Sequence, residues 1–496
     1  MLADSDLLSI QEARDLVCRS ADAQAAYHGF DQAGVDRVCE AIALQSRHHA
    51  ERLGRLAVEE TGFGDARGKA RKTLFAAEQV WESIKDLKTV GVIRADEQNR
   101  VYELAEPYGV IVAIVPVTNP TSTALYKILI ALKTRNSIVM SPHPRAVRCI
   151  GETCKVAMDA AARAGAPKDL ITCMSRPTIE GTQEAMKHRR TALILATGGP
   201  GLVRAAYSSG KPAIGVGPGN VPAYVERTAD VEHAVEAIVQ SQVFDNSTLC
   251  CSEQSVVVDR VIDAAVREAF RRRGAHFCTP QEKDKLARIV VSGRAINPAI
   301  VGQYPWKIAE MAGFPVPRAT TVLLAEEDGV GWDHPLSVEK LAPILAYYTV
   351  ADWKEGCERC IEILDFGGRG HTLVIHSSND EVIWAYAREK PTHRILVNSP
   401  ASHGGVGYST NLRPSMTLGC GSFGGNITSD NISAEHLMLV KRVAWVKPGF
   451  VEQEAREREK RASAGGGVSE YGGARTRPPD LGVHARRDLP RPPRGY

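Results

Sequence analysis

The chain contains 496 residues, of which 44% are hydrophobic and 24% are charged, so it is long enough for two or three packed domains and has a globular composition. Its net charge of +3 arises after residue 450, which leaves no basic surface for nucleic acid on the rest of the chain. No apolar run approaches the ~20 residues of a membrane helix, and the N-terminus lacks a signal-peptide pattern. We therefore expect a cytoplasmic protein with no nucleic-acid and no membrane partner.

Helices come first in the predicted order of elements, and strands and helices then alternate. Amphipathic periodicity predicts helices over residues 7–27, 34–61 and 66–87. A strand hairpin is expected over residues 98–110. Further alternating elements are predicted at residues 137–140, 145–164, 193–196 and 202–209, with later strands near 255–258, 321–324, 345–348 and 372–375. This alternation favours parallel α/β sheets.

These elements predict an α/β fold with two parallel α/β domains, spanning residues 1–229 and 230–400. Residues 401–450 are expected to return to the first domain. Residues 451–496 are rich in charge, glycine, proline and arginine, and we expect them to be disordered because they offer too little apolar surface to offset their ordering entropy.

Cysteine usage argues against disulfides and against a metal. The count of eleven is odd and the residues are scattered, which favours reduced thiols. Cys357 and Cys360 form a single C-x-x-C inside a predicted helix. Without a second pair of ligands we interpret them as packed thiols and expect no metal site.

Cys250 stands in the segment Phe244–Gln254, which reads F-D-N-S-T-L-C-C-S-E-Q and precedes an apolar strand. A thiol on a polar loop beside a buried strand is where a rigid scaffold presents a nucleophile to a cleft. The alternative is a buried cysteine that acts as a small hydrophobe. Cys251 is expected to be such a packed thiol.

The segment around Cys250 resembles the nucleophile motif of the CoA-acylating branch of the aldehyde dehydrogenase superfamily. Seven further segments, in the same order along residues 5–446, also resemble that branch: Glu106–Ile111, Thr118–Thr123, Ser141–Ala146, Ala196–Gly201, Glu339–Pro343, Gly370–Thr372 and Leu418–Asn426. The resemblance implies a Rossmann-like cofactor domain in residues 1–229, a catalytic thiol domain in residues 230–400 and a small oligomerisation hairpin. The chain ends without an iron-dependent alcohol dehydrogenase half, so we do not expect it to make alcohol.

The resemblance assigns roles to three catalytic candidates. Cys250 would be the nucleophile, and Asn119 would donate to the developing oxyanion together with the backbone N–H of Cys250. Asn119 could instead be a turn residue before Pro120. His371 lies in the G-H-T segment and could accept a proton from Cys250 or CoA, although a histidine in such a turn is as often structural.

The resemblance also implies a site for NAD, with NADP as an alternative. Ser141 and His143 would face the adenosine end. The glycine-rich stretch after a strand would contact the pyrophosphate at a helix N-terminus, and Glu339 would bind ribose or be a solvated carboxylate. The implied cofactor residues are Ser141, His143, Thr197, Gly198, Gly199, Pro200, Gly201, Gly217 and Glu339. His403 and Arg413 fall in a variable loop on the substrate side, where Arg413 could bind an anionic group or be solvated.

A missing carboxylate indicates the reaction. Hydrolytic aldehyde dehydrogenases carry a glutamate in an E-L-G-G motif that activates water, whereas the matching segment here, Ile214–Asn220, contains none. An acyl group on Cys250 should therefore persist until the thiol of CoA attacks it. The predicted products are acyl-CoA and NADH; the rival is an enzyme that releases the free acid.

Expected partners are an aldehyde, CoA and further copies of the chain in a homodimer or homotetramer. A hypothesis of another class makes the chain cargo of a bacterial microcompartment, with residues 451–496 docking to a shell protein. The motifs do not select among short-chain, sulfonated and carboxylated aldehydes.

Overall fold

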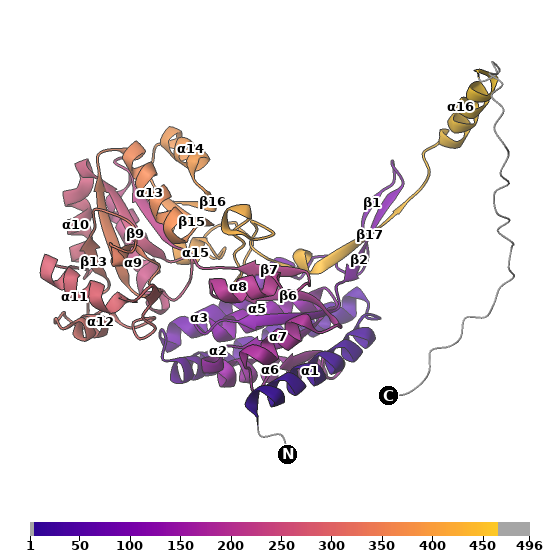
Figure 1. Ribbon diagram of the computed structural model, residues 1–496, viewed down its shortest axis with the longest axis horizontal. Helices are drawn as coiled ribbons and strands as arrows, with labels where there is room; N and C mark the ends of the chain where they lie inside the picture. Colours follow the sequence, from indigo (N-terminus) through magenta and orange to yellow (C-terminus); the bar gives the residue numbers. More distant parts are fainter. Residues whose placement is uncertain (1–3, 465–496) are drawn as a thin grey trace, which may run out of the picture. The chain divides into compact units, whose positions relative to one another are not determined.

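The computed structural model describes residues 4–464 (Figure 1). One large compact unit comprises residues 4–95 and 102–443, and a small separate unit comprises residues 96–101 and 444–464. The large unit contains a five-stranded and a seven-stranded sheet, and neighbouring strands within each are parallel. The predicted α/β class with two parallel domains is confirmed.

The five-stranded sheet has the order β5-β4-β3-β6-β7, and its central strand β3 is fully buried. Alternate residues of β3 face opposite sides: Ile111 packs with α2, α5 and α6, and Val112 packs with α1, α7 and α8. The strands are β3 (Val110–Val115), β4 (Ser137–Pro142), β5 (Ile171–Cys173), β6 (Thr191–Thr197) and β7 (Ala213–Val216). The helices are α1 (Ser5–Tyr27), α2 (Gln32–Thr61), α5 (Pro120–Lys133), α6 (Val147–Arg163), α7 (Ile179–Lys187) and α8 (Pro200–Tyr207).

The seven-stranded sheet has the order β10-β13-β14-β9-β8-β15-β16. Helices α9 and α10 pack on one face and α13 and α14 on the other. Cys357 and Cys360 lie buried on α13 in an apolar cluster, as predicted, and the Cys357 thiol also contacts Glu389 and Lys390. The strands are β8 (Val221–Val225), β9 (Glu253–Asp259), β10 (His276–Phe277), β13 (Leu323–Glu326), β14 (Ile344–Val350), β15 (Gly370–His376) and β16 (Thr392–Val397). The helices are α9 (Val231–Val243), α10 (Asp263–Arg272), α11 (Pro280–Val290), α12 (Pro305–Ala312), α13 (Trp353–Gly367) and α14 (Asp380–Glu389).

The hairpin predicted over residues 98–110 is wrong. Strand β2 (Val101–Pro107) belongs to a three-stranded sheet with β1 (Gly91–Asp96) and β17 (Met438–Ala444), whereas β3 belongs to the five-stranded sheet. The physical reason is burial: every residue of β3 is buried, as a central parallel strand requires, while most of β2 is only half-buried.

Three other predicted boundaries differ from the structure. Strand β8 lies in the seven-stranded sheet, so this sheet begins before the domain boundary that we expect at residue 229. The helix predicted over residues 66–87 is α3 (Ala66–Phe75), a π-helical turn (Ala76–Val80) and α4 (Trp81–Ile84). We expect residues 451 onward to be disordered, but the first of them belong to helix α16 (Phe450–Ala464). The rest of that predicted tail, residues 465–496, lies outside the described residues.

Within residues 4–464, none of the helices has both the length and the apolar character needed to cross a membrane.

Candidate active site

A cavity of about 650 Å³ lies where the five-stranded sheet ends, and Cys250 is on its wall. The last residues of β3, β4, β6 and β7 all border it. This is the carboxyl edge of a parallel sheet, where ligands bind in open α/β folds. Ten of the predicted site residues line it: Asn119, Ser141, His143, Thr197, Gly198, Gly199, Gly201, Gly217, Cys250 and Glu339. The lining residues do not include Pro200, His371, His403 or Arg413.

The loop that carries Cys250 begins with an unusual backbone turn. Asp245, Asn246 and Ser247 have φ angles of 50°, 50° and 62°, so three consecutive non-glycine residues are left-handed. Such residues cost on the order of 1 kcal/mol or more each, and they persist only where their surroundings hold them. The nucleophile loop therefore depends on contacts from elsewhere in the chain.

Asp245 supplies those contacts through both of its carboxylate oxygens. Oδ1 accepts the backbone N–H of Asp65 at 2.8 Å, and Oδ2 binds Lys69 Nζ at 2.7 Å, Lys72 Nζ and the Thr248 hydroxyl. Burial by itself would raise the pKa of Asp245, but the two ammonium groups outweigh it and hold that pKa below its ordinary value. The buried carboxylate is therefore charged and fixes the turn.

Two glycines allow α3 and its N-terminal loop to approach this carboxylate. A Cβ atom at Gly64 would lie 1.9 Å from Asp245 Oδ1, and one at Gly68 would lie 2.6 Å from Asp245 Cβ. Gly64 also has a φ of 75°. Any larger residue at either position would push Asp245 away from its partners.

Asn119 caps the start of α5 and is 7% exposed. Its Oδ1 accepts a hydrogen bond from Lys72 Nζ at 2.5 Å, and its Nδ2 donates to the carbonyl oxygen of Thr248 at 3.1 Å and to Thr118 Oγ1 at 3.2 Å. One amide N–H thus faces the nucleophile loop and the other faces Thr118, and Asn119 lies on the cavity wall that also carries Cys250.

The two adjacent cysteines differ in exposure. Cys250 is half-buried at the cavity, while Cys251 is fully buried and donates to the carbonyl oxygen of Ser402 at 3.7 Å. Burial raises the pKa of the Cys250 thiol well above its ordinary value, with Cys251 and Glu339 acting in the same direction. In this state the thiol is protonated, and it needs a proton acceptor to become a nucleophile.

His371 and Glu339 form a second group of residues near Cys250, around Gly219. A Cβ atom at Gly219 would lie 2.6 Å from the Cys250 carbonyl oxygen and 2.8 Å from His371 Cγ, so the imidazole and the nucleophile loop both crowd this glycine. The Nδ1 of His371 lies 3.0 Å from Thr372 Oγ1, and its buried Nε2 has no partner among the described residues. Burial, and then Arg394, lower the pKa of His371 to about 3, so the ring is neutral near pH 7.

Glu339 accepts the backbone N–H of Gly219 at 3.1 Å. Burial raises the pKa of this carboxyl to about 8. It is the only carboxylate among the residues that line the cavity.

The glycine-rich stretch joins β6 to α8. Side chains added at Gly199, Gly201 or Gly217 would meet no protein atom within 4 Å, so these positions leave space at the helix N-terminus. Open backbone N–H groups at a helix start suit a phosphate. At the other wall of the cavity, the hydroxyl groups of Ser141 and Thr182 form a hydrogen bond of 2.8 Å. The open glycines and these polar groups together fit a dinucleotide.

His403 and Arg413 do not join this cavity. The ring of His403 packs between Phe244 and Tyr408, at centroid distances of 4.7 and 5.3 Å. Arg413 forms an ion pair with Glu435 and lines a second, polar cavity.

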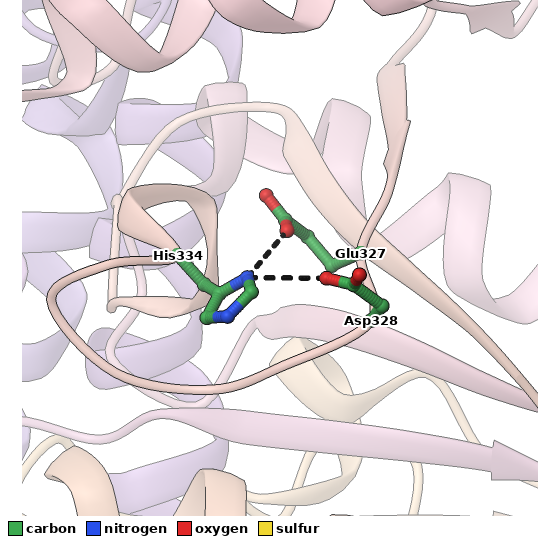
Figure 2. Close-up of side chains that lie close together, drawn as sticks. All are labelled: Glu327, Asp328 and His334. Carbon is green, nitrogen blue, oxygen red and sulfur yellow. Dashed lines mark hydrogen bonds and ion pairs between the residues drawn. The ribbon is translucent and has the colours of Figure 1, made fainter.

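One cluster of potential metal ligands occurs in the part of the chain described, and none of its members lines this cavity (Figure 2). His334 Nδ1 lies 3.2 Å from Glu327 and 3.4 Å from Asp328. Lys283 Nζ already lies 3.0 Å from the same Glu327 oxygen. We therefore interpret this cluster as an ion-pair network.

Sequence reasoning missed the buried charges beneath the nucleophile loop, Lys69, Lys72 and Asp245. The lysines stand in the charged stretch A-R-G-K-A-R-K, which is typical of a solvated helix. Their spacing of three residues, which places them on one helix face, was the available indication.

Comparison with known proteins identifies the family of the chain. The model of the Aldehyde dehydrogenase family matches residues 2–287. The chain belongs to the aldehyde dehydrogenase family. It is 44% identical over 441 residues to the bifunctional aldehyde-alcohol dehydrogenase of Escherichia coli, covering 88% of this chain and 50% of that protein, so it spans about half the length of this relative.

Solved structures of the family match over nearly their whole length. An acetylating aldehyde dehydrogenase from Geobacillus thermoglucosidasius is 50% identical, with a TM-score of 0.89 over 90% of this chain and 99% of that one. A propionaldehyde dehydrogenase from Rhodopseudomonas palustris, solved with bound CoA and an acylated cysteine, is 29% identical, with a TM-score of 0.80 over 88% and 97% of the two chains.

Proposed function

We propose that this chain is an NAD(P)-dependent, CoA-acylating aldehyde dehydrogenase that forms a thioester on Cys250 and transfers the acyl group to CoA. The observation that carries the proposal is the segment Gly215–Gly219 beside the nucleophile, which has no carboxylate to activate water. The acylated cysteine and bound CoA of the Rhodopseudomonas palustris relative support the same chemistry.

Each residue has a separate role in the proposed reaction. Cys250 Sγ attacks the aldehyde carbonyl, its proton passes to a base, and His371 Nε2 is the unpartnered neutral acceptor in the group around Gly219. The Asn119 Nδ2–H stabilises the oxygen that becomes negative. A bound nicotinamide would supply the hydride acceptor needed to oxidise the hemithioacetal on Cys250 to a thioester. The thiol of CoA then attacks that thioester and regenerates Cys250.

Glu339 offers a rival reaction, because a carboxyl with a pKa near 8 at the cavity could act as a base for water. The hydrogen bond from the Gly219 N–H fixes the orientation of the Glu339 carboxyl. We therefore propose that Glu339 binds the ribose and does not activate water.

A steady-state experiment separates the two reactions. NADH formation is measured with and without CoA, for NAD and NADP, on acetaldehyde, propionaldehyde, succinate semialdehyde and sulfoacetaldehyde. We expect a burst of about one NADH per active site without CoA, and continuous turnover only with CoA. Continuous CoA-independent turnover with release of free acid would overturn the proposal.

We further propose that the chain forms a homodimer or homotetramer. The three-stranded sheet leaves Val92, Leu439 and Val443 between 42% and 49% exposed, which is apolar surface suited to a second copy. Light scattering coupled to gel filtration tests this, and a monomer at micromolar concentration would refute it.

Docking to a microcompartment shell is not favoured by the described part of the tail. Helix α16 is dominated by glutamate and arginine, and its large apolar residues are confined to Phe450 and Val451 at its start. A helix that docks into a groove needs an apolar stripe along its length.

A further inference from the structure

Lys72 is a buried cation with three partners at the edge of the candidate active site. It lies on α3 and is 2% exposed. Its Nζ donates to Asn119 Oδ1 at 2.5 Å and to Thr248 Oγ1 at 2.9 Å, and it pairs with the carboxylate of Asp245. An ammonium group has three protons, and these three acceptors account for all of them.

The contact with Asn119 decides which way its amide points. An ammonium group donates and never accepts, so the amide atom that faces Lys72 has to be the oxygen. The amide nitrogen then faces the other way, toward the Thr248 carbonyl oxygen in the nucleophile loop. A reversed amide would present its oxygen to the loop and would repel a negatively charged reaction intermediate.

The surrounding charges add to this effect. Lys69 and Lys72 share a single buried carboxylate, Asp245, so the group carries one excess positive charge where all three side chains are at most 2% exposed. Poorly solvated charge of this sign favours a neighbouring oxyanion.

We propose that Lys72 is a positioning residue that acts through Asn119: it holds the amide in the orientation that donates to the oxyanion formed on Cys250. This inference rests on the proposed function in assigning Asn119 to the oxyanion, but it applies whether the thioester goes to CoA or to water.

A double-mutant cycle tests the coupling. We measure the single-turnover rate of NADH formation without CoA for Lys72→Met, Asn119→Ala and the double variant. Losing one oxyanion donor costs ~10²-fold or more, and we expect Lys72→Met to cost ~10-fold or more in the parent enzyme. In the Asn119→Ala background it should cost less than ~3-fold, since the amide that it orients is gone.

Lys69→Met is the matched control. Lys69 lies one turn earlier on α3, is 1% exposed and binds Asp245 at 2.7 Å, but its other partner is the Thr118 carbonyl oxygen. Either substitution leaves one lysine paired with Asp245, so the loss of buried charge is the same. The effects of Lys69→Met and Asn119→Ala should multiply, because Lys69 does not bind the amide.

The pH dependence gives a second readout. Burial lowers the pKa of Lys72 to about 8, opposed by Asp245 and Asp65 and reinforced by Lys69; other titratable groups nearby are Arg71, His403 and Cys251. The ratio of the parent rate to the Lys72→Met rate should therefore fall as pH rises from 7 to 9.5, because the parent loses the ammonium that the variant already lacks.

Multiplicative effects of Lys72→Met and Asn119→Ala, an unchanged single-turnover rate in Lys72→Met, or a loss confined to KM would each overturn the inference. If Lys72→Met does not fold, Lys72→Leu, which also removes the donor to Asn119, takes its place under the same coupling criterion. Failure of the proposed function would show separately, as continuous turnover without CoA.

Discussion

The two flanks of Cys250 differ in how their buried polar groups are satisfied. On the flank of α3, Lys72, Asp245 and the Asn119 amide each have partners for all their polar atoms. On the flank of β15, His371 keeps Nε2 without a partner in the described chain, and Glu339 has a pKa raised to about 8. Hydrogen bonding on the α3 flank is therefore complete before substrate binds, whereas on the β15 flank one buried nitrogen still lacks a partner in the described chain.

This difference corresponds to two kinds of task. A donor to an oxyanion acts best when its orientation is fixed in advance, as that of the Asn119 amide is; one of its N–H groups then leaves Thr118 Oγ1 or the Thr248 carbonyl oxygen for the oxyanion. A base or a ligand-binding group has to change partners during turnover, and the unpartnered Nε2 of His371 is free to do so, although burial makes this nitrogen a weaker base than that of an exposed histidine.

The largest expected effect comes from the nucleophile between the flanks. Cys250→Ala should abolish NADH formation, in the burst and in the steady state, because no other thiol lines the cavity among the described residues. Cys251→Ala is the control: its thiol is fully buried against Ser402, and the variant should keep most of the activity. Equal losses in the two variants would contradict the assignment of Cys250.

On the unsatisfied flank, His371→Ala should lower CoA-dependent kcat by ~10²-fold or more, the usual contribution of a general base. His376 is a matched control on the same strand, since it is also fully buried with a pKa lowered to about 3. His376→Ala should change stability and leave kcat near that of the parent. Comparable kcat losses in both variants would indicate a structural role for His371.

On the fixed flank, Asn119→Ala should lower kcat by ~10²-fold with little change in KM for the aldehyde. The rate is followed as NADH absorbance at saturating CoA. An effect confined to KM would mean that Asn119 binds substrate and does not stabilise the reaction intermediate.

The smallest effect is on stability. Because burial raises the pKa of Glu339 to about 8, the folded protein holds a proton that the unfolded chain releases above pH ~4.3. The contribution of Glu339 to stability therefore falls as pH rises from about 4.3 to 8. Glu339→Gln removes that slope, so its Tm relative to the parent should rise by about 2 °C or more between pH 5 and pH 8 in thermal melts. A difference in Tm that stays constant with pH would show that the carboxyl is solvated.

Much of the sheet architecture could be predicted from the sequence, because buried parallel strands are continuous apolar runs, as in β3 and β9. The partner of a strand is harder to predict. Residues 101–107 and 110–115 are adjacent in the chain and look like a hairpin, yet they pair in different sheets, and only burial in the assembled fold separates them.

The same limit applies to the site. Cys250, Asn119 and the glycines stand in local motifs, so sequence reasoning finds them. The environment of Lys72 is created by Asp245, which lies 173 residues later, and only its three-residue spacing from Lys69 sets it apart locally from the exposed Arg71 beside it. Arg413 shows the converse, since a motif position suggested a substrate contact and the structure pairs the side chain with Glu435.

The left-handed turn before Cys250 links catalysis to assembly of the chain. Its anchors on α3 and the preceding loop lie 173 to 180 residues earlier, so the loop depends on contacts from beyond its own neighbours, and closing such a long contact carries an entropic cost. During synthesis the helical region is complete long before residues 245–250 emerge. A partly assembled chain therefore carries Cys250 without the arrangement of Asn119 and Lys72 around its loop, and we expect catalysis only when the two segments meet.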